Sequence, residues 1–181
     1  MGVEIEVSIW IALHHLTEIL NALKGIHDAQ GIREHEAADA DVAKRIHHLI
    51  DNLFADTVSG IPGDEDGGGM SSFVVFSMMG FFPVTPGIPV YAIGSPFFDE
   101  ITITLPGGKS FTVKAKNYSK ENKYIQSARL NGKALDRSWF THEELMAGGV
   151  LELAMGPLPN KDWGRDNLPP SSIGWSCSQL K

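Results

Sequence analysis

The chain has 181 residues, of which 43% are hydrophobic and 20% are charged, and its formal net charge is -7. This length suits one domain or two small ones, and the composition is that of a globular protein rather than a disordered one. A negative net charge disfavours binding that neutralises phosphates, so nucleic acid is not an expected partner. The single cysteine, Cys177, excludes an internal disulfide and a cysteine-based metal cluster.

Residues 1–41 are expected to form one helix and a polar connection. Apolar residues recur at helical spacing over residues 8–27, whereas residues 28–41 (DAQGIREHEAADAD) are polar and acidic and predict a solvated linker. His27 and His35 lie beside acids there, but they match no tight metal-ligand spacing. No basic region precedes the first apolar stretch, and no stretch approaches the roughly 20 residues that span a bilayer. We therefore expect neither a signal peptide nor a membrane partner.

Two further helices are expected before residue 84. The helical period returns over residues 42–58, and residues 71–80 are apolar on nearly every side. Such an apolar helix is typically buried among other helices. Ser71 or Ser72 is its expected N-terminal cap.

From residue 84 the hydrophobic period changes to two, which is typical of strands. Strands are expected over residues 89–93, 101–105, 110–114, 125–130 and 150–154. Asn131-Gly132 predicts a tight hairpin, and Thr141 with Glu144 is a capping-box pattern for one short helix. Several short strands at this spacing predict an antiparallel β-sandwich or sheet, so the fold class is α+β. Residues 166–181 are expected to form a tail.

The stretch GIPGDEDGGGMSSF, residues 61–74, places three acids and three glycines directly before the apolar helix. Carboxylates there lie near the positive end of the helix dipole, and glycine allows a close approach of the backbone. An EF-hand calcium loop does not fit, because Gly68 and Val75 occupy positions that require ligands. A phosphate cradle is disfavoured, because no lysine follows GGGMS and the acids would repel the anion.

A run of three acids is most often a solvated loop, and the third functional interpretation is acid–base catalysis by paired carboxylates, as in glycoside hydrolysis. In an extended loop, Asp64 and Asp66 project to one side and Glu65 to the other. An inverting glycosidase holds its acid and its base on opposite sides of the sugar, about 6.5–9.5 Å apart. Two aspartates of one loop are therefore expected to share one task. One activates the water, and the other orients it or opposes its partner's ionisation by like-charge repulsion.

A close resemblance to the C-terminal part of the glycoside hydrolase family 92 α-mannosidases is carried by GIPGDEDGGGMSSFVVFSMMGFFPVTPGIPVYAIGSPFFDEITITLPGGKSFTV. That family is typified by G-N-E-D-x-G-x-M-S-x-W, followed by G-F-Y-P-V-x-P-G and G-S-P-x-F. The resemblance covers about residues 42–165. Residues 1–40 show no such likeness.

The resemblance implies an exo-acting, calcium-dependent α-mannosidase that inverts the anomeric centre of a mannose-containing glycan. It implies that residues 42–83 are the last helices of an (α/α)6 catalytic barrel and that residues 84–165 are a C-terminal antiparallel β domain. The aspartates that the family offers for activating water fall on Asp64 and Asp66. Position 64 is often Asn in the family pattern, so Asp66 is the preferred assignment.

Family members are several times longer than this chain. The resemblance implies that the glutamate acting as general acid, the principal calcium site and most of the barrel lie upstream. We therefore expect a C-terminal fragment or a truncated homologue that is inactive alone and that self-associates or docks with the missing segments. Gly69 and Phe73 stand where Gln and Trp are common, which alters the side-chain contacts of the loop. Members of the family are typically secreted or periplasmic.

The alternative is a non-catalytic module in which the β part is a scaffold or a carbohydrate-binding surface. Trp139, Trp163 and Trp175 would then be stacking platforms for sugar. Packing roles are the more common use of tryptophan in a folded domain.

Overall fold

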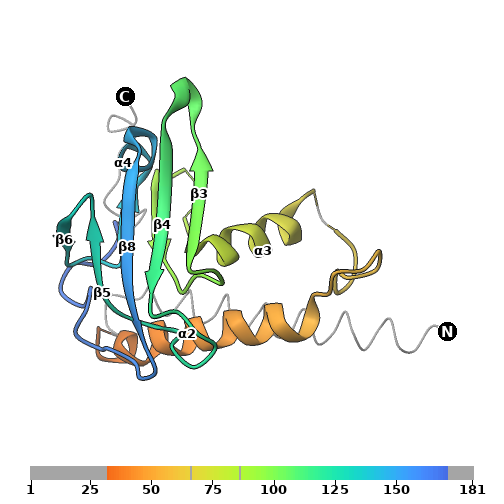
Figure 1. Ribbon diagram of the computed structural model, residues 1–181. Helices are drawn as coiled ribbons and strands as arrows, with labels where there is room; N and C mark the ends of the chain where they lie inside the picture. The colour runs from red at the N-terminus through yellow and green to blue at the C-terminus, as the bar shows by residue number, and fades with distance from the viewer. Residues whose placement is uncertain (1–31, 66, 86, 171–181) are drawn as a thin grey trace. The chain divides into compact units, whose positions relative to one another are not determined.

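The computed structural model describes residues 32–65, 67–85 and 87–170 (Figure 1). The predicted helix over residues 8–27 lies outside these ranges, as do Trp175 and Cys177. The chain forms two compact units, which are divided between Val75 and Phe76. In the described part of the chain, no helix is long and apolar enough to cross a membrane.

The helix α2 (Ile32–Leu53) begins within the stretch that was expected to be a linker, so that prediction is wrong from residue 32 onward. Residues 32–41 are polar, but they include alanine, glutamate and arginine, which favour helices, and they contain neither glycine nor proline. Near the other end of α2, Asn52 Nδ2 donates a hydrogen bond of 2.7 Å to the carbonyl of His48. Such side-chain bonding competes with the helical ladder, and α2 ends before the predicted residue 58.

The helix α3 (Gly69–Met79) confirms the predicted apolar helix. It crosses the division between the two units. Its last residues belong to the second unit, where Phe76 and Met79 pack against the hydrophobic core. The helix ends immediately before Gly80, as expected.

Two sheets and a short helix make up most of the second unit. One sheet has the order β1-β2-β7 and the other has the order β3-β4-β8-β5-β6. The strands are β1 (Phe81–Phe82), β2 (Val90–Ile93), β3 (Glu100–Thr104), β4 (Ser110–Lys116), β5 (Tyr124–Leu130), β6 (Lys133–Leu135), β7 (Trp139–Thr141) and β8 (Gly149–Gly156). The 3-10 turn η1 (Pro106–Gly108) joins β3 to β4, and α4 (His142–Ala147) precedes β8. The expected strands are confirmed, whereas β1 and β7 were not expected because they are too short to show an alternation.

The hairpin between β5 and β6 forms at the predicted dipeptide. Leu130 pairs with Lys133, and the two residues between them both have positive φ, 51° at Asn131 and 78° at Gly132. A two-residue turn of this kind matches the twist of the flanking strands and favours Asn-Gly.

The five-stranded sheet is mixed, so the expectation of a purely antiparallel β part is wrong. β4 and β8 pair in parallel, with Phe111 opposite Gly149 and Lys116 opposite Ala154. Parallel neighbours require a long crossover connection, and here the chain passes through β5, β6, β7 and α4 before it returns as β8.

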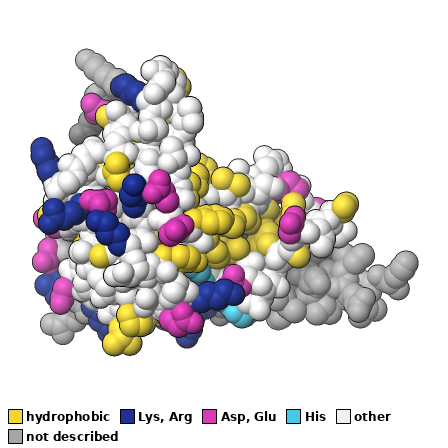
Figure 2. Space-filling model, viewed as in Figure 1, with side chains coloured by type: hydrophobic (Ala, Val, Ile, Leu, Met, Phe, Trp, Pro, Cys, Tyr) yellow, Lys and Arg dark blue, Asp and Glu magenta, His cyan; other side chains and the backbone are white. Residues whose placement is uncertain are grey.

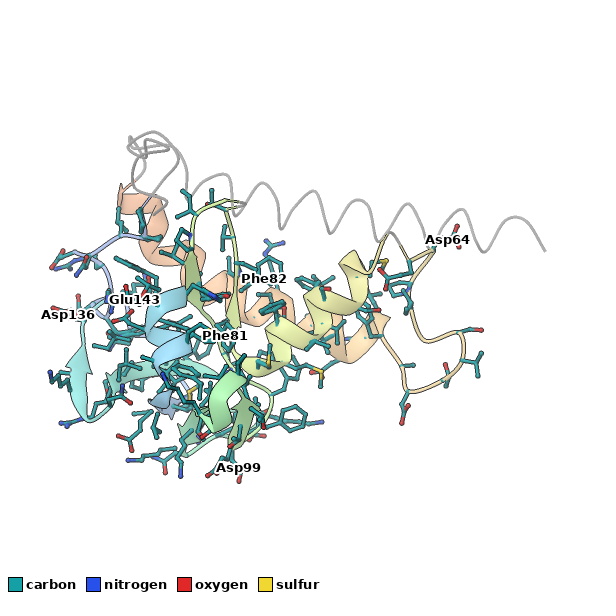
Figure 3. All side chains as sticks on the ribbon, turned by 90° about the horizontal axis from the view of Figure 1, so that it is seen from above. Asp64, Phe81, Phe82, Asp99, Asp136 and Glu143 are labelled. Carbon is teal, nitrogen blue, oxygen red and sulfur yellow. The ribbon has the colours of Figure 1, made fainter. Side chains whose placement is uncertain are left out.

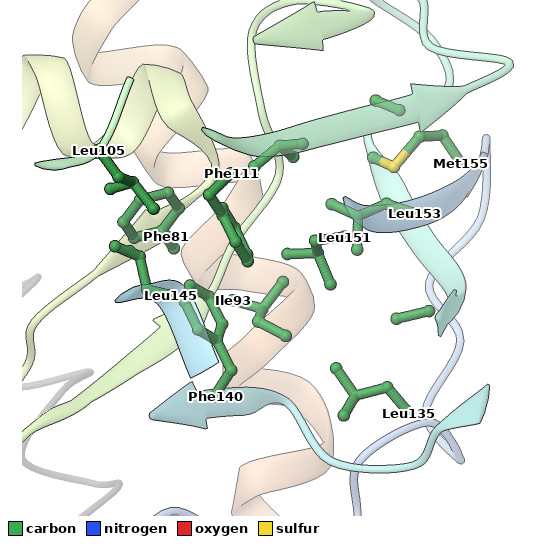
Figure 4. Packing of buried hydrophobic residues seen from close by; sticks show 13 residues of the cluster. Phe81, Ile93, Leu105, Phe111, Leu135, Phe140, Leu145, Leu151, Leu153 and Met155 are labelled. Atoms are coloured by element: carbon green, nitrogen blue, oxygen red, sulfur yellow. The ribbon is translucent and has the colours of Figure 1, made fainter. Parts of the chain in front are cut away.

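The core of the second unit draws side chains from both sheets (Figure 4). The aromatic ring of Phe140 in β7 lies 5.3 Å from that of Phe81 and 5.4 Å from that of Phe111, measured between centroids. Alternate residues of the central strands β4 and β8 point into this core and are almost wholly buried: Phe111, Val113, Ala115, Leu151, Leu153 and Met155. The period of two in the sequence therefore identifies the core-facing side of the sheet correctly.

The other face of the five-stranded sheet carries charges of alternating sign. Glu100, Lys114, Glu152 and Arg129 lie opposite one another on β3, β4, β8 and β5. The ammonium of Lys114 lies 3.1 Å from the Glu100 carboxylate, and that of Lys116 lies 2.7 Å from the Glu152 carboxylate. The hydrogen bond and the charge of Lys116 lower the pKa of Glu152. Positive and negative side chains are accordingly intermixed over the strands in Figure 2.

Candidate functional site

The loop before α3 is held by Glu65, the middle residue of the three acids. Its carboxylate accepts hydrogen bonds from the backbone N–H of Met70 at 2.9 Å and of Ser71 at 3.0 Å, and from the Ser71 hydroxyl. The first N–H groups of a helix have no partner within the helix, and a negative charge is favourable at that end. Glu65 therefore acts as the N-terminal cap of α3.

This capping arrangement corrects the prediction made from the sequence. Ser71 lies inside α3 and contributes its hydroxyl to Glu65, and Ser72 lies one residue further along. Neither serine precedes the helix, so neither is an N-cap in the usual sense. The extended-loop geometry predicted that Glu65 projects away from the two aspartates, and it did not predict the capping contact. An acid shortly before an apolar helix is the signal from which it could have been found.

Asp64 directly precedes this cap and is exposed. Figure 3 shows its side chain on the loop before α3, directed away from the helix. Asp66 lies outside the described residues, so the predicted projection of the two aspartates to one side stays a prediction. Glu65 lies between the two aspartates in the sequence, and its carboxylate is bound to the start of α3. These hydrogen bonds hold the backbone from which Asp64 projects.

The glycines that follow the acids have a conformational function. Gly67 and Gly68 have φ of 58° and 86°, in the left-handed region that residues with a side chain seldom adopt. A Cβ atom built on either residue would have no neighbour within 4 Å among the described residues. The loop therefore turns into α3 through glycines, with open space beside their backbone.

For a calcium site among the described residues, the relevant feature is a cluster of side chains that bind metals. No group of three or more His, Cys, Asp or Glu side chains with metal-binding geometry occurs in residues 42–65, 67–85 and 87–170. Calcium takes six to eight oxygen ligands, which include carboxylates, carbonyls and waters. The expected placement of the main calcium site outside this chain remains a prediction.

Trp139 and Trp163, which lie in the described part of the second unit, are used for packing. The indole N–H of Trp139 donates to the carbonyl of Asn167 at 3.0 Å, and the guanidinium of Arg137 lies 4.5 Å above its ring. The indole N–H of Trp163 donates to the carbonyl of Leu135 at 2.8 Å, and its ring packs against the core. These contacts disfavour Trp139 and Trp163 as stacking platforms for sugar.

A polar network at the start of α4 confirms the predicted capping box and extends it. The Thr141 hydroxyl accepts the N–H of Glu144 at 3.1 Å, and the Glu144 carboxylate accepts the N–H of Thr141 at 2.8 Å. Arg137 also forms an ion pair with Glu144. Although desolvation raises the pKa of Glu144, the contacts with Arg137 and Thr141 outweigh it and lower the pKa below its usual value. This network connects β7 to α4 and is structural.

Comparison with known families places most of this chain in one of them. The family model described as the glycosyl hydrolase family 92 catalytic domain matches residues 36–157. An uncharacterized secreted glycosidase of the fungus Arthroderma benhamiae is 47% identical over 134 residues, which are 71% of this chain and 17% of that protein.

Solved structures show the same relationship. An inverting family GH92 mannosidase from Bacteroides thetaiotaomicron is 43% identical with a TM-score of 0.66, over 71% of this chain and 18% of that one. A family GH92 α-mannosidase from the same bacterium, solved in complex with mannoimidazole, is 31% identical with a TM-score of 0.70, over 75% of this chain and 18% of that one. The chain thus spans less than a fifth of the length of these relatives. It belongs to glycoside hydrolase family 92.

Proposed function

We propose that this chain is the C-terminal portion of an inverting, exo-acting α-mannosidase and that it carries the base side of the active site. Glycan hydrolysis is the chemistry of the family to which the chain belongs. The inverting mannosidase among the solved relatives supports the finer proposal, as does the relative that was solved with mannoimidazole. The mannosidase is proposed to act on a mannose-containing glycan.

In this proposal, Asp66 accepts a proton from the attacking water while Asp64 orients that water. The water oxygen forms a bond to the anomeric carbon as the bond to the leaving oxygen breaks. The leaving oxygen takes its proton from a general acid on the opposite side of the sugar, and that acid is proposed to lie in a part of the protein beyond this chain. The chain alone is therefore proposed to be inactive.

One observation carries this assignment: the carboxylate between the two aspartates is bound to the end of α3. A catalytic base must be held within a fraction of an ångström of its productive position. Because Glu65 fixes the loop, Asp64 projects from a backbone whose position is set by a helix, and the open space beside Gly67 and Gly68 leaves room for a ligand.

Further proposals concern calcium, the β part and the place of action. The principal calcium site is proposed to be completed by residues beyond this chain, and we assign no step to the ion here. The second unit is proposed to be a β-sandwich attached to the last helices of an (α/α)6 barrel.

Action outside the cytoplasm is proposed because the fungal relative is a secreted glycosidase. Measuring the protein in the culture medium and in the cells of its source organism tests this location.

The catalytic proposal is tested by measuring mannose release from α-1,2-mannobiose in the presence of calcium. The chain alone is expected to release none. A chimera in which residues 42–165 replace the matched segment of a Bacteroides family 92 mannosidase is expected to be active. In this chimera, Asp66→Ala is expected to lower kcat by about 10²- to 10⁴-fold, the usual contribution of a general base.

Asp56→Ala is the matched control, because Asp56 is an exposed aspartate that lies before the loop. It is expected to leave kcat of the chimera unchanged. Turnover by the chain alone that disappears in Asp66→Ala would overturn the proposal that the acid lies elsewhere. Full activity of the Asp66→Ala chimera would overturn the base assignment.

A further inference from the structure

We propose that Asn117 is an acceptor site for N-linked glycosylation, which goes beyond the proposed hydrolase activity and rests on the location outside the cytoplasm proposed above. The segment Asn117-Tyr118-Ser119 has the required pattern of asparagine, a residue other than proline, and a hydroxyl residue. Of the asparagines in the sequence, Asn117 alone has serine or threonine two positions later. The ligand class is an oligosaccharide attached covalently to a side-chain amide.

The turn that contains this segment presents Asn117 to solvent. Asn117 directly follows the last residue of β4, and it is exposed. Its φ of 63° lies in the left-handed region, which asparagine adopts more readily than most residues. The next residue, Tyr118, packs against the hydrophobic core. The turn is thus anchored on one side while Asn117 faces outward.

The side-chain amide of Asn117 is available for modification. In the described ranges, that amide takes part in no hydrogen bond, and the contact of this residue is made by its carbonyl, which accepts from Asn122 Nδ2 at 3.0 Å. Other asparagines differ: Asn131 Oδ1 accepts from Val150 N at 2.8 Å, and Asn160 Nδ2 donates to the Gln126 carbonyl at 2.7 Å. A glycan on Asn117 would displace none of the structural hydrogen bonds that these two side chains make.

The hydroxyl of Ser119 indicates when the transfer takes place. It donates to Glu121 Oε2 at 2.9 Å and accepts from the N–H of Asn122 at 3.1 Å. The hydrogen bond from Ser119 also lowers the pKa of Glu121. Because the folded turn occupies the hydroxyl that a transferase must recognise, the oligosaccharide is attached before this turn closes.

The chemical step requires a lipid pyrophosphate-linked oligosaccharide as the donor. Asn117 Nδ2 forms a bond to the first sugar carbon, and the bond between that carbon and the pyrophosphate oxygen breaks. The amide loses one proton, and the lipid pyrophosphate leaves with the bonding electron pair. The product is a bulky, solubilising group at the protein surface.

The test is to secrete the full chain from a eukaryotic host behind a cleavable signal sequence, with a C-terminal tag that carries its own acceptor sequence. Only molecules with a glycosylated tag are scored, so each scored chain has reached the transferase. Removal of glycans by a peptide amidase is expected to convert Asn117 to aspartate, as read by peptide mass. Asn117→Gln and Ser119→Ala are expected to abolish this conversion, whereas Ser119→Thr is expected to retain it.

The thermal midpoint of the glycosylated chain is expected to equal that of the deglycosylated chain, because the glycan replaces no contact. An unmodified Asn117 in molecules whose tag is glycosylated would overturn the proposal. A glycan that persists on residues 117–119 in the Ser119→Ala variant would overturn the proposal that the transferase recognises Asn117 through the Asn-Tyr-Ser pattern. Neither result bears on mannose release, so a failure here is distinct from a failure of the proposed hydrolase function.

Discussion

The two units bury their apolar side chains to very different extents. In the second unit, Phe111, Phe140, Leu151 and Leu153 have no exposed surface, and both sheets contribute to one core. In residues 42–65 and 67–75 of the first unit, the buried side chains are His47, Leu49 and Ile50. The exposed large apolar side chains there are Val58, Ile61 and Val75.

This difference follows from how sheets and helices bury surface. Two sheets can enclose a core between them, whereas a helix that is apolar on nearly every side requires neighbours on nearly every side. Apolar side chains gather over α3 in Figure 2. Such exposure is expected in a chain that spans less than a fifth of the length of its relatives. The second unit is therefore the one expected to fold as an independent body.

The largest expected effect is the loss of the central aromatic side chain of the second unit. Phe140→Ala should lower the free energy of unfolding of that unit by about 3–5 kcal/mol, because it leaves a cavity between the two sheets. Urea unfolding followed by tryptophan fluorescence measures it. Phe98→Ala is the matched control, since Phe98 is 48% exposed, and it should change the free energy by less than about 0.5 kcal/mol. Equal effects of the two variants would contradict the assignment of the core.

Removing the charge of Glu144 should destabilise the second unit by about 1 kcal/mol at neutral pH, since the carboxylate is partly exposed and screened. The contacts with Arg137 and Thr141 lower the folded-state pKa of Glu144, so the stabilisation is present above the unfolded pKa of about 4.3. It is lost as pH falls through the lower folded-state value.

The difference in unfolding free energy between the wild type and Glu144→Gln should therefore shrink as the pH is lowered from about 5 to about 3. Urea titrations at several pH values measure this difference. Glu143→Gln changes the exposed neighbour in the same helical turn and should give a small difference. If the difference between the wild type and Glu144→Gln grew on acidification, the pKa of Glu144 would be raised on folding and not lowered, which would contradict the prediction.

In the first unit, Glu65→Ala should destabilise the start of α3 by about 1 kcal/mol, because two backbone N–H groups lose their acceptor. A loss of about 1 kcal/mol raises the equilibrium constant for local opening of the helix start about fivefold. The backbone amides of Met70 and Ser71 should therefore exchange their hydrogens about fivefold faster. Ser72→Ala is the control, and it should leave these rates unchanged. An effect of Ser72→Ala alone would restore the serine cap that the structure argues against.

The smallest expected effect on folding comes from Val75→Lys, which changes an exposed position and should alter stability by less than about 0.5 kcal/mol. Its effect should appear in association, because the self-association predicted for this chain depends on exposed apolar helix surface. Sedimentation velocity should show a shift of Val75→Lys toward monomer. Leu158→Lys, which changes an exposed residue of the second unit, should leave association unchanged. A reversal of these two results would assign the association to the second unit.

Local features of the sequence predicted much of the second unit. Alternation marked the core-facing side of β4 and β8, Asn131-Gly132 marked the hairpin, and Thr141 with Glu144 marked α4. Each of these signals depends on residues that are adjacent or within one turn of one another. The helical character of residues 32–41 was not predicted, because their polarity is also typical of a solvated linker although their helix propensity is high.

The assignment of the candidate site residues stays a prediction. The order of acids and glycines, together with the family resemblance, identified the loop and named Asp64 and Asp66 as the candidate residues. The function of Glu65 was not identified, because its partners at Met70 and Ser71 become accessible only when the loop reverses direction through Gly67 and Gly68.

The amino-acid sequence by itself determined which segments are strands or apolar helix, which side of each central strand is buried, and which loop bears the acids. The tertiary structure alone decided that β4 lies parallel to β8. The physical reason is the range of the interactions. Alternation and capping patterns act between near neighbours in the chain, whereas the pairing of β4 with β8 depends on which distant strands satisfy each other's hydrogen bonds while the core is buried.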